Sequence, residues 1–275
     1  MKKVVSFMLA VVAIVCLVSC GGNSKSSVPT EYCEELVKLA EEGNAEAQVN
    51  LAKCYANGSG VEKSDEEANM WIAKAAEQGN ADALAEMGNI YMFGYGVEID
   101  YNEAIKWYRI AAEKGQTVAM SNLGMCYEEG KGTQQDFKEA FSWFMKAAEQ
   151  GDAAAQKFVG DYYMFDFDKI NIQKDEQKAF DWYLKSAEQN EPQAQYNLFI
   201  CYLNGLGIEQ DDEEAFKWLN KSAKQGYVNA RYDLAIAYYN GKGVMQDMNK
   251  AVEIMKSLAA EGYEPAKNAL SKIGY

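Results

Sequence analysis

The most reactive side chains in this sequence are those of six cysteines, and no histidine accompanies them. Cys54, Cys126 and Cys201 each stand directly before a tyrosine. A thiolate acts as a nucleophile or a metal ligand only with a neighbouring base or further ligands, and histidine is the commonest of both. We therefore find no catalytic or metal-binding constellation and expect neither enzyme activity nor a cofactor. The three thiols are interpreted as buried and free.

Pairs of glycines separated by one residue are a second group that could do chemistry. They recur at residues 58–60, 94–96, 130–132, 205–207 and 241–243. A glycine-rich loop binds phosphate when it follows a strand and ends in Gly-Lys-Ser or Gly-Lys-Thr. Here no strand pattern precedes the glycines, and that ending is absent. The pairs are predicted to be structural turns.

A third chemical feature lies at the end of the first twenty residues. Two lysines precede an apolar run over residues 4–18, which is too short to span a bilayer but typical of a signal peptide. The run is followed by Ser19 and Cys20, and this ending resembles the lipobox of bacterial lipoproteins. The resemblance implies a signal peptide over residues 1–19 and lipid attachment at Cys20. The alternative is an ordinary secretory leader with an incidental cysteine.

The residues after Cys20 fit a lipid-anchored chain. Residues 20–29 are rich in glycine and serine, which is the composition of a flexible tether. In such lipoproteins an aspartate directly after the cysteine favours the inner membrane, and Gly21 takes that place here. The resemblance therefore implies a bacterial cell envelope location, at the outer membrane, with membrane contact through the N-terminal lipid.

A regular series of tryptophans shows which elements position all these residues. The intervals between them are 36, 36, 39 and 36 residues, and a fixed period of this size is typical of a repeat array. Each period reads as helix, glycine turn, helix, glycine turn. The second helix of each unit is preceded by a residue that caps helices well. The tryptophans are Trp71, Trp107, Trp143, Trp182 and Trp218; the capping residues are Ser64, Asp100, Asp136, Asp175, Asp211 and Asp247.

This pattern resembles the Sel-one-like repeat family, which is related to tetratricopeptide repeats. The resemblance covers about residues 31–273, and the predicted solenoid domain is residues 30–275. The resemblance implies an all-α fold, a right-handed α-α superhelical solenoid of six helix-turn-helix repeats. Capping helices are expected near residues 32–43 and 264–273. The tryptophan, tyrosine and alanine series are predicted to form the core, in which large and small residues alternate.

Two features depart from the regular pattern. The fourth unit carries three inserted residues and replaces its glycine turn over residues 164–174, where Asn171 takes the place of the second glycine. We expect a longer loop there, either a tolerated insertion or a partner contact. Cys33 and Cys54 fall on adjacent predicted helices, and whether they form a disulfide stays open.

The groove of the solenoid is the surface on which the resemblance places a ligand. The first helix of each unit lines it, and the basic residues with which some tetratricopeptide proteins hold a C-terminal carboxylate are missing. Methionine and aromatic side chains at the groove positions favour an apolar or amphipathic peptide segment. The predicted contacts are Met92, Phe93, Met125, Met164, Phe165, Tyr196, Tyr232 and Tyr239.

Charge and composition narrow the function further. The formal net charge is −14, and loss of the two leader lysines would make it more negative. Such a chain repels phosphate backbones, so no nucleic acid is expected as a partner. We predict a non-enzymatic protein–protein interaction scaffold that binds an envelope protein or peptide. A peptidoglycan-binding or other glycan-binding protein is the first alternative, and a β-lactam or cell-wall hydrolase is the second.

Overall fold

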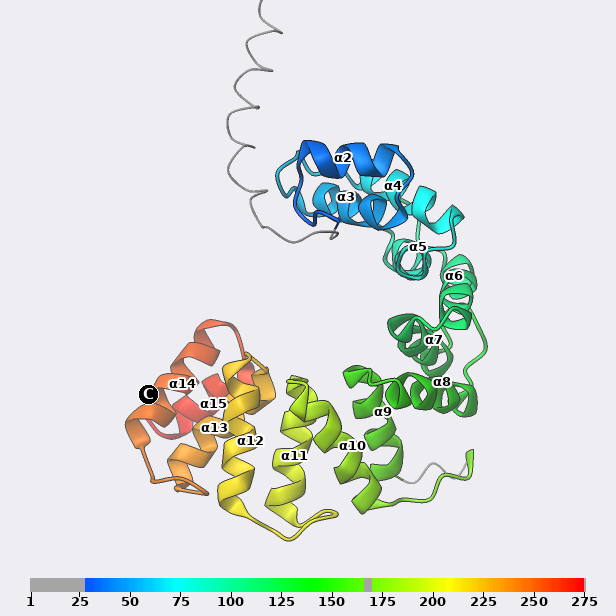
Figure 1. Cartoon of the computed structure of the whole chain (residues 1–275). Helices are drawn as coiled ribbons and strands as arrows, with labels where there is room; N and C mark the ends of the chain where they lie inside the picture. The colour runs from blue at the N-terminus through cyan, green and yellow to red at the C-terminus, as the bar shows by residue number, and fades with distance from the viewer. Residues whose placement is uncertain (1–27, 166–169, 275) are drawn as a thin grey trace, which may run out of the picture. The chain divides into compact units, whose positions relative to one another are not determined.

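The computed structural model describes residues 28–165 and 170–274 of this chain. Cys20, the predicted signal peptide and most of the predicted tether lie outside the described residues. The described residues form helices α2 to α15, joined by short turns (Figure 1). No helix in this part of the chain combines the length and the apolarity that are needed to cross a bilayer.

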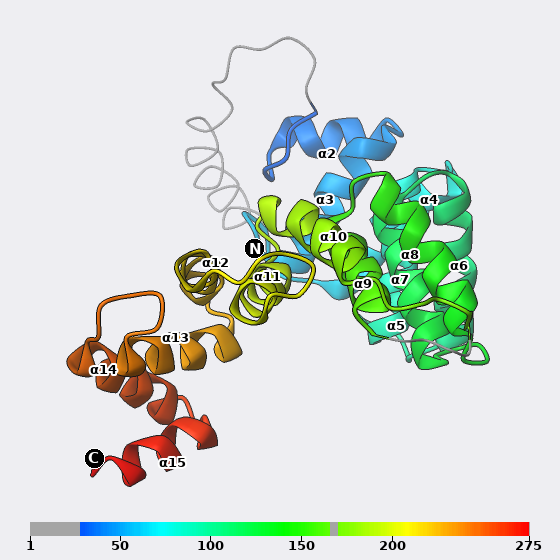
Figure 2. The same cartoon turned by 90° about the horizontal axis from the view of Figure 1, so that it is seen from below.

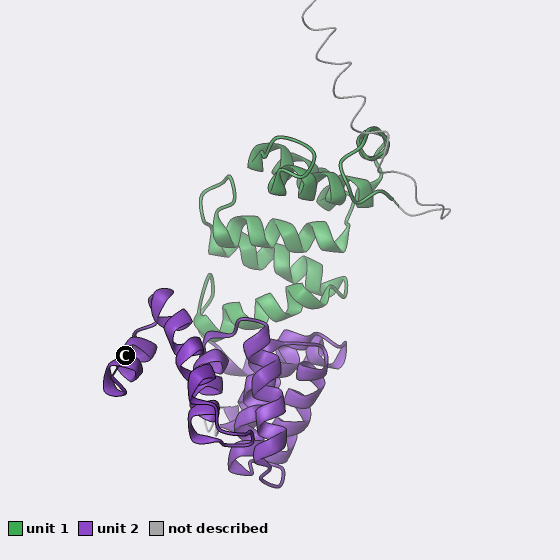
Figure 3. Cartoon of the chain, turned by 90° about the vertical axis from the view of Figure 1, so that its left-hand side faces the viewer, with its two compact units in different colours: residues 1–135 green, residues 136–275 purple. Residues whose placement is uncertain are grey.

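The chain divides into two compact units, residues 1–135 and 136–275 (Figure 3). Within each unit every helix packs against the next one along the chain, as α11 does beside α12 in Figures 1 and 2. The first unit contains α2 (Glu34–Glu41), α3 (Ala45–Asn57), α4 (Asp65–Glu77), α5 (Ala81–Phe93), α6 (Tyr101–Glu113) and α7 (Thr117–Glu129). The second contains α8 (Phe137–Glu149), α9 (Ala153–Met164), α10 (Glu176–Glu188), α11 (Pro192–Asn204), α12 (Asp212–Lys224), α13 (Val228–Asn240), α14 (Met248–Ala260) and α15 (Glu264–Lys272).

The helix ends form where the sequence predicts them. All six predicted capping side chains accept a hydrogen bond from a backbone N–H in the first turn of the second helix, as Ser64 does from Glu67 at 3.1 Å. In five repeats a glycine in the left-handed region ends the first helix, for example Gly94 at φ 72°. The all-α repeat fold is confirmed, with α2 and α15 as the extra helices at its ends.

The tryptophan series is a correction to the predicted core. Only Trp71 is buried, with 7% of its surface exposed, and the other four tryptophans are half-buried. The Nζ atom of Lys146 lies 4.0 Å from the ring centre of Trp143, because a residue three positions later shares the same helix face. The predicted alanine series is buried, so small residues do allow the helices to approach closely.

The residue that follows each tryptophan is the true large core residue. Phe144 and Leu219 have no exposed surface, and Tyr108 and Tyr183 are almost as deeply buried. Their size is matched on the first helix: a Cβ atom at Gly88 would lie 2.3 Å from the ring of Tyr108. A Cβ atom at Gly160 would lie 2.5 Å from the ring of Tyr183. In these two repeats glycine is required because the aromatic ring lies directly on the helix backbone.

The fourth repeat differs from the others as predicted. Asn171 has φ 58° and so adopts the left-handed conformation expected of the glycine it replaces. After the segment 166–169, which lies outside the described residues, Ile170 and Ile172 border a surface hollow with Phe141 and Met145 of α8. The described end of this loop therefore lies near the second helix of the preceding repeat.

Candidate functional site

The predicted contact residues occupy different environments on the first helices. Met92 is a correction, because it is 8% exposed and belongs to the core of the first unit. Phe93 and Phe165 are 58% and 61% exposed at the ends of α5 and α9. The remaining predicted residues, Met125, Met164, Tyr196, Tyr232 and Tyr239, are half-buried or exposed.

The structure groups part of the predicted set in the second unit. Tyr196 on α11 contacts Tyr227, with ring centres 5.3 Å apart. Tyr232 on α13 lies edge-on to Tyr263, with ring centres 5.6 Å apart. These four half-buried tyrosines form an aromatic surface at the N-terminal ends of α11, α13 and α15. We call Tyr196, Tyr227, Tyr232 and Tyr263 the tyrosine cluster.

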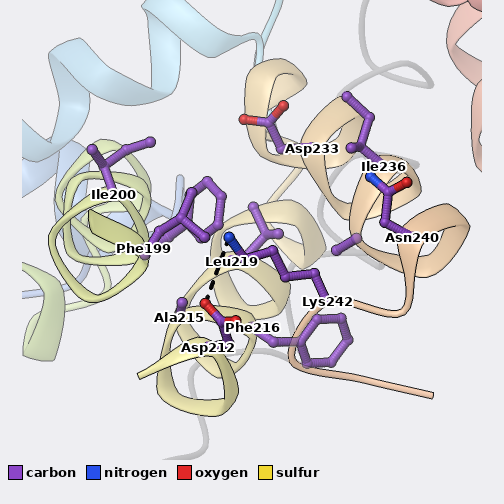
Figure 4. A pocket seen from close by; sticks show the side chains of 12 residues that line it. Phe199, Ile200, Asp212, Ala215, Phe216, Leu219, Asp233, Ile236, Asn240 and Lys242 are labelled. Carbon is purple, nitrogen blue, oxygen red and sulfur yellow. Dashed lines mark ion pairs between the residues drawn. The ribbon is translucent and has the colours of Figure 1, made fainter. Parts of the chain in front are cut away.

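Beside the tyrosine cluster lies an apolar cavity of about 180 Å³ between α11, α12 and α13 (Figure 4). Phe199 and Ile200 come from α11, and Leu219 comes from α12. Ile236 and Asp233 come from α13, so the half-buried carboxylate of Asp233 lies among apolar walls. The exposed pair of Lys242 and Asp212 also borders the cavity, with 3.7 Å between Nζ and Oδ1.

Asp233 connects the cavity to the tyrosine cluster. The hydroxyl of Tyr196 donates a hydrogen bond of 2.6 Å to Oδ2 of Asp233. Burial raises the pKa of the Asp233 carboxyl, and the hydrogen bond from Tyr196 acts in the opposite direction. Burial also raises the pKa of the Tyr196 hydroxyl, which therefore remains a donor at neutral pH. A carboxylate accepts at both oxygens, so Oδ1 of Asp233 can accept a bond from a ligand in the cavity.

A polar series on the first helices was missed by the sequence analysis. In the second unit the hydroxyl of Tyr183 donates to Oδ1 of Asp161 at 2.8 Å, and Nδ2 of Asn197 donates to the same atom at 3.2 Å. Nζ of Lys157 lies 3.2 Å from Oδ2 of Asp161. This network ties three consecutive helices together. The signal in the sequence was a polar residue at the fixed positions of Asp161 and Asn197.

The first unit contains a counterpart of this network, in which the neutral amide of Asn89 takes the place of the Asp161 carboxylate. The hydroxyl of Tyr108 donates to Oδ1 of Asn89 at 2.7 Å, and Nδ2 of Asn122 donates to that atom at 3.2 Å. Nδ2 of Asn89 donates to Oε2 of Glu86 at 3.0 Å. The equivalent polar residues therefore serve the packing between repeats in both units.

The cysteines in the described part of the chain do not form a reactive site. Cys33, Cys54, Cys126 and Cys201 are buried and free, and Cys33 caps α2 by accepting from the N–H of Leu36 at 3.4 Å. Burial raises the pKa of Cys126 and of Cys201 to about 12, so both thiols are protonated at neutral pH. Within residues 28–165 and 170–274, no three Cys, Asp or Glu side chains are grouped to hold a metal ion.

Comparison with solved structures places this geometry among known repeat proteins. The protective antigen c5321 of uropathogenic Escherichia coli, which displays an SLR fold, is 37% identical with a TM-score of 0.74. That alignment covers 90% of this chain and 52% of the antigen, so the chain spans about half of the antigen's length. A Sel1 repeat protein from Oxalobacter formigenes is 35% identical with a TM-score of 0.72, covering 81% of this chain and 89% of that protein.

More distant structures share the fold alone. The immunity protein Pa5087 from Pseudomonas aeruginosa is 18% identical with a TM-score of 0.53, covering 81% of this chain and 83% of that protein. No curated protein matches the chain. The Sel1 repeat model matches six consecutive segments, which begin at the first helix of each pair: residues 45–80, 81–116, 117–152, 153–191, 192–227 and 228–263. This chain therefore belongs to the Sel1 repeat family.

Proposed function

We propose that this protein is a lipid-anchored, non-enzymatic scaffold that binds an apolar or amphipathic segment of an envelope protein. Sel1 repeat proteins generally mediate protein–protein interactions, which supports the general class of function. The observation that carries the specific proposal is the α11–α13 surface, where the tyrosine cluster adjoins an apolar cavity that contains the half-buried carboxylate of Asp233.

The chemistry of this surface defines the segment that it would bind. The cavity of about 180 Å³ accepts one apolar side chain, and apolar cavities of about 150 Å³ take up benzene. The tyrosine cluster offers broad, rigid contact area beside it, and aromatic residues are enriched among the residues that dominate binding energy. Asp233 would accept a hydrogen bond from a donor next to the apolar group. These properties fit a peptide better than a small polar metabolite.

A double substitution tests the surface. Replacing Tyr196 and Tyr232 by alanine is expected to lower the affinity for captured envelope partners by more than about tenfold, because each aromatic anchor typically contributes about 2 kcal/mol. The control is Tyr101→Ala, since Tyr101 is a tyrosine with 38% of its surface exposed and lies at the start of α6, outside the α11–α13 surface. Urea unfolding of each variant separates loss of binding from loss of folding.

The outcomes separate the competing functions. A folded double variant that captures the same proteins as the wild type would contradict the α11–α13 surface. Retention of the wild-type protein on purified peptidoglycan, with no protein partner captured, would favour a glycan-binding function. Turnover of a chromogenic β-lactam would contradict the non-enzymatic assignment.

The membrane anchor has its own test. Cys20→Ser is expected to abolish lipid attachment, so the chain should move from the membrane fraction to the soluble fraction or persist as an uncleaved precursor. Intact-mass analysis of the wild-type mature chain should show a lipid on an N-terminal cysteine. A mature chain without lipid would overturn the proposed attachment at Cys20 and with it the proposed outer-membrane location.

A further inference from the structure

The space between neighbouring repeats is filled differently along this chain. In the second repeat Tyr108 follows the tryptophan, and its ring lies on Gly88 with the hydroxyl at Asn89. In the fourth repeat Tyr183 does the same with Gly160 and Asp161. In the first repeat the equivalent residue is Ile72, and its side chain is too short to reach across.

The space that Ile72 leaves is an open cavity of about 330 Å³ between α3, α4 and α5. Ala52 stands at the position of Gly88, so little volume is added from the first helix. Ala68, Ile72 and Ile90 form buried apolar walls. Since the exposed side chain of Lys53 also lines the cavity, the cavity is open to solvent on the side of the first helices.

Two of the polar groups of this cavity, Lys53 and Glu86, match the two sides of a phenol hydroxyl; the other polar groups that line it include Asn57, Lys63, Asp65 and Asn69. The hydroxyl of Tyr108 faces two side chains in its own repeat interface, Asn89 as acceptor and Asn122 as donor. In the cavity the position of Asn89 is taken by Lys53, and the position of Asn122 is taken by Glu86. Lys53 is a donor and Glu86 is an acceptor, so the cavity also offers one of each. The donor and the acceptor have exchanged positions relative to Asn89 and Asn122.

We propose that the cavity between α3, α4 and α5 binds the side chain of a tyrosine that a partner presents to this protein. The ring occupies the space that Tyr108 and Tyr183 fill in their own repeats. The hydroxyl donates to Glu86 and accepts from Lys53. This inference rests on the proposed function only in taking a protein segment as the ligand, and it concerns a different site from the α11–α13 surface.

A tyrosine fits this cavity better than an aliphatic side chain for two reasons. The volume exceeds that of cavities that bind benzene, so a ring enters without displacing the walls. Oε2 of Glu86 also accepts from Asn89, so the hydroxyl would add a bond to a carboxylate that can accept several. An aliphatic group or a phenyl ring would cover Glu86 and Lys53 without making any hydrogen bond to them, which carries a free-energy cost. The site should therefore distinguish tyrosine from phenylalanine.

The test uses N-acetyl-tyrosinamide as the probe and N-acetyl-phenylalaninamide as its matched control. Each is titrated into the purified full chain, in two-dimensional NMR spectra with assigned amides. The tyrosine probe is expected to shift amides of α3, α4 and α5 saturably and to bind about 3- to 10-fold more tightly than the control, the effect of one net hydrogen bond.

Two variants locate the probe. Ala52→Gly with Ile72→Tyr rebuilds the Gly88–Tyr108 arrangement inside the cavity and is expected to abolish binding. Ala52→Gly alone leaves the cavity open and is expected to retain it. Glu86→Ala keeps the apolar walls, so it should remove the preference for tyrosine over phenylalanine while weak binding of both probes remains.

Three results would overturn the proposal. These are no saturable shift with the wild-type chain, equal affinity for the two probes, and unchanged binding in the folded Ala52→Gly, Ile72→Tyr variant. If that variant does not fold by circular dichroism, Glu86→Ala decides the question alone. The Tyr196 and Tyr232 double variant should bind the probe like the wild type, so a failure of the α11–α13 surface leaves this result unaffected.

Discussion

Two neighbouring interfaces in the first unit show how one residue decides between a core and a site. Between α5, α6 and α7, Tyr108 fills the space and its hydroxyl bonds to Asn89. Between α3, α4 and α5, Ile72 stands in the same place, and a cavity of about 330 Å³ remains. The helices and their caps are equivalent in both interfaces. The side chain after the tryptophan is therefore one determinant of whether the repeat interface is closed or open to a ligand, together with the side chains that face it.

The second unit also contains one closed and one open interface, but its cavity is less polar than the one in the first unit. Tyr183 closes the interface of α9, α10 and α11, whereas Leu219 leaves a cavity of about 180 Å³ between α11, α12 and α13. Phe199 occupies the position of Gly160 there, so a ring from the first helix takes up part of the space. As a result this cavity is smaller and more apolar than the one beside Ile72. The two open interfaces therefore suit different side chains.

The largest expected effect tests which aromatic series forms the core. Phe144→Ala should lower the free energy of unfolding by about 3–5 kcal/mol, because Phe144 is fully buried and stacks on Phe158 with ring centres 4.5 Å apart. Trp143→Ala should cost about 2 kcal/mol or less, since Trp143 is only half-buried. Urea unfolding measures both. Equal losses would contradict the assignment of the core to the residue after the tryptophan.

The next effect separates the charged and neutral versions of the closed interface. Tyr183→Phe should cost about 1–2 kcal/mol, because Asp161 loses a charge-assisted bond in a partly exposed position. Tyr108→Phe, which removes the bond to the neutral Asn89, should cost about 1 kcal/mol or less. Thermal or urea unfolding compares the two variants. A larger loss for Tyr108→Phe would reverse the expected order.

Adding a methyl group at Gly160 tests how closely the ring of Tyr183 packs on the helix backbone. Gly160→Ala should cost about 1–3 kcal/mol, because the new Cβ would lie 2.5 Å from the buried ring of Tyr183. Ala52→Gly is the matched change at an open interface and should cost only about 0.5–1 kcal/mol, the usual backbone entropy effect. Urea unfolding reports both values. A stabilising Gly160→Ala would show that Tyr183 has room to move.

The smallest effect concerns pH at the second cavity. Burial raises the pKa of Asp233 in the folded chain, so the folded state binds its proton more readily than the unfolded state. The contribution of this group to stability is then greatest at low pH and is lost as pH rises through the folded pKa. Relative to Asp233→Asn, the wild type should gain stability as the pH falls from neutral toward about 4. A constant difference between the two proteins would contradict this.

Local chemistry let the sequence predict most of the fold. Each capping side chain, such as Ser64, and each glycine after a first helix acts on backbone within one or two helical turns. The period of the tryptophans shows how often this local pattern recurs. Asn171 likewise adopts the positive φ angle expected from its place in the repeat. The repeat number, the helix pairs and the terminal helices followed from these signals without any knowledge of packing.

The tertiary structure alone decided what each position in the repeat faces. The 36-residue period is equally consistent with a core residue at Trp143 or at Phe144. Only helix packing shows that Phe144 is buried and Trp143 is half-buried. In the same way Met92 belongs to the core although its position in the repeat suggested the groove. Burial and cavities depend on the sizes of side chains from three different helices, as for Ile72 and Ala52 opposite Glu86. No single repeat contains that information, because its partners lie a full repeat away in the sequence.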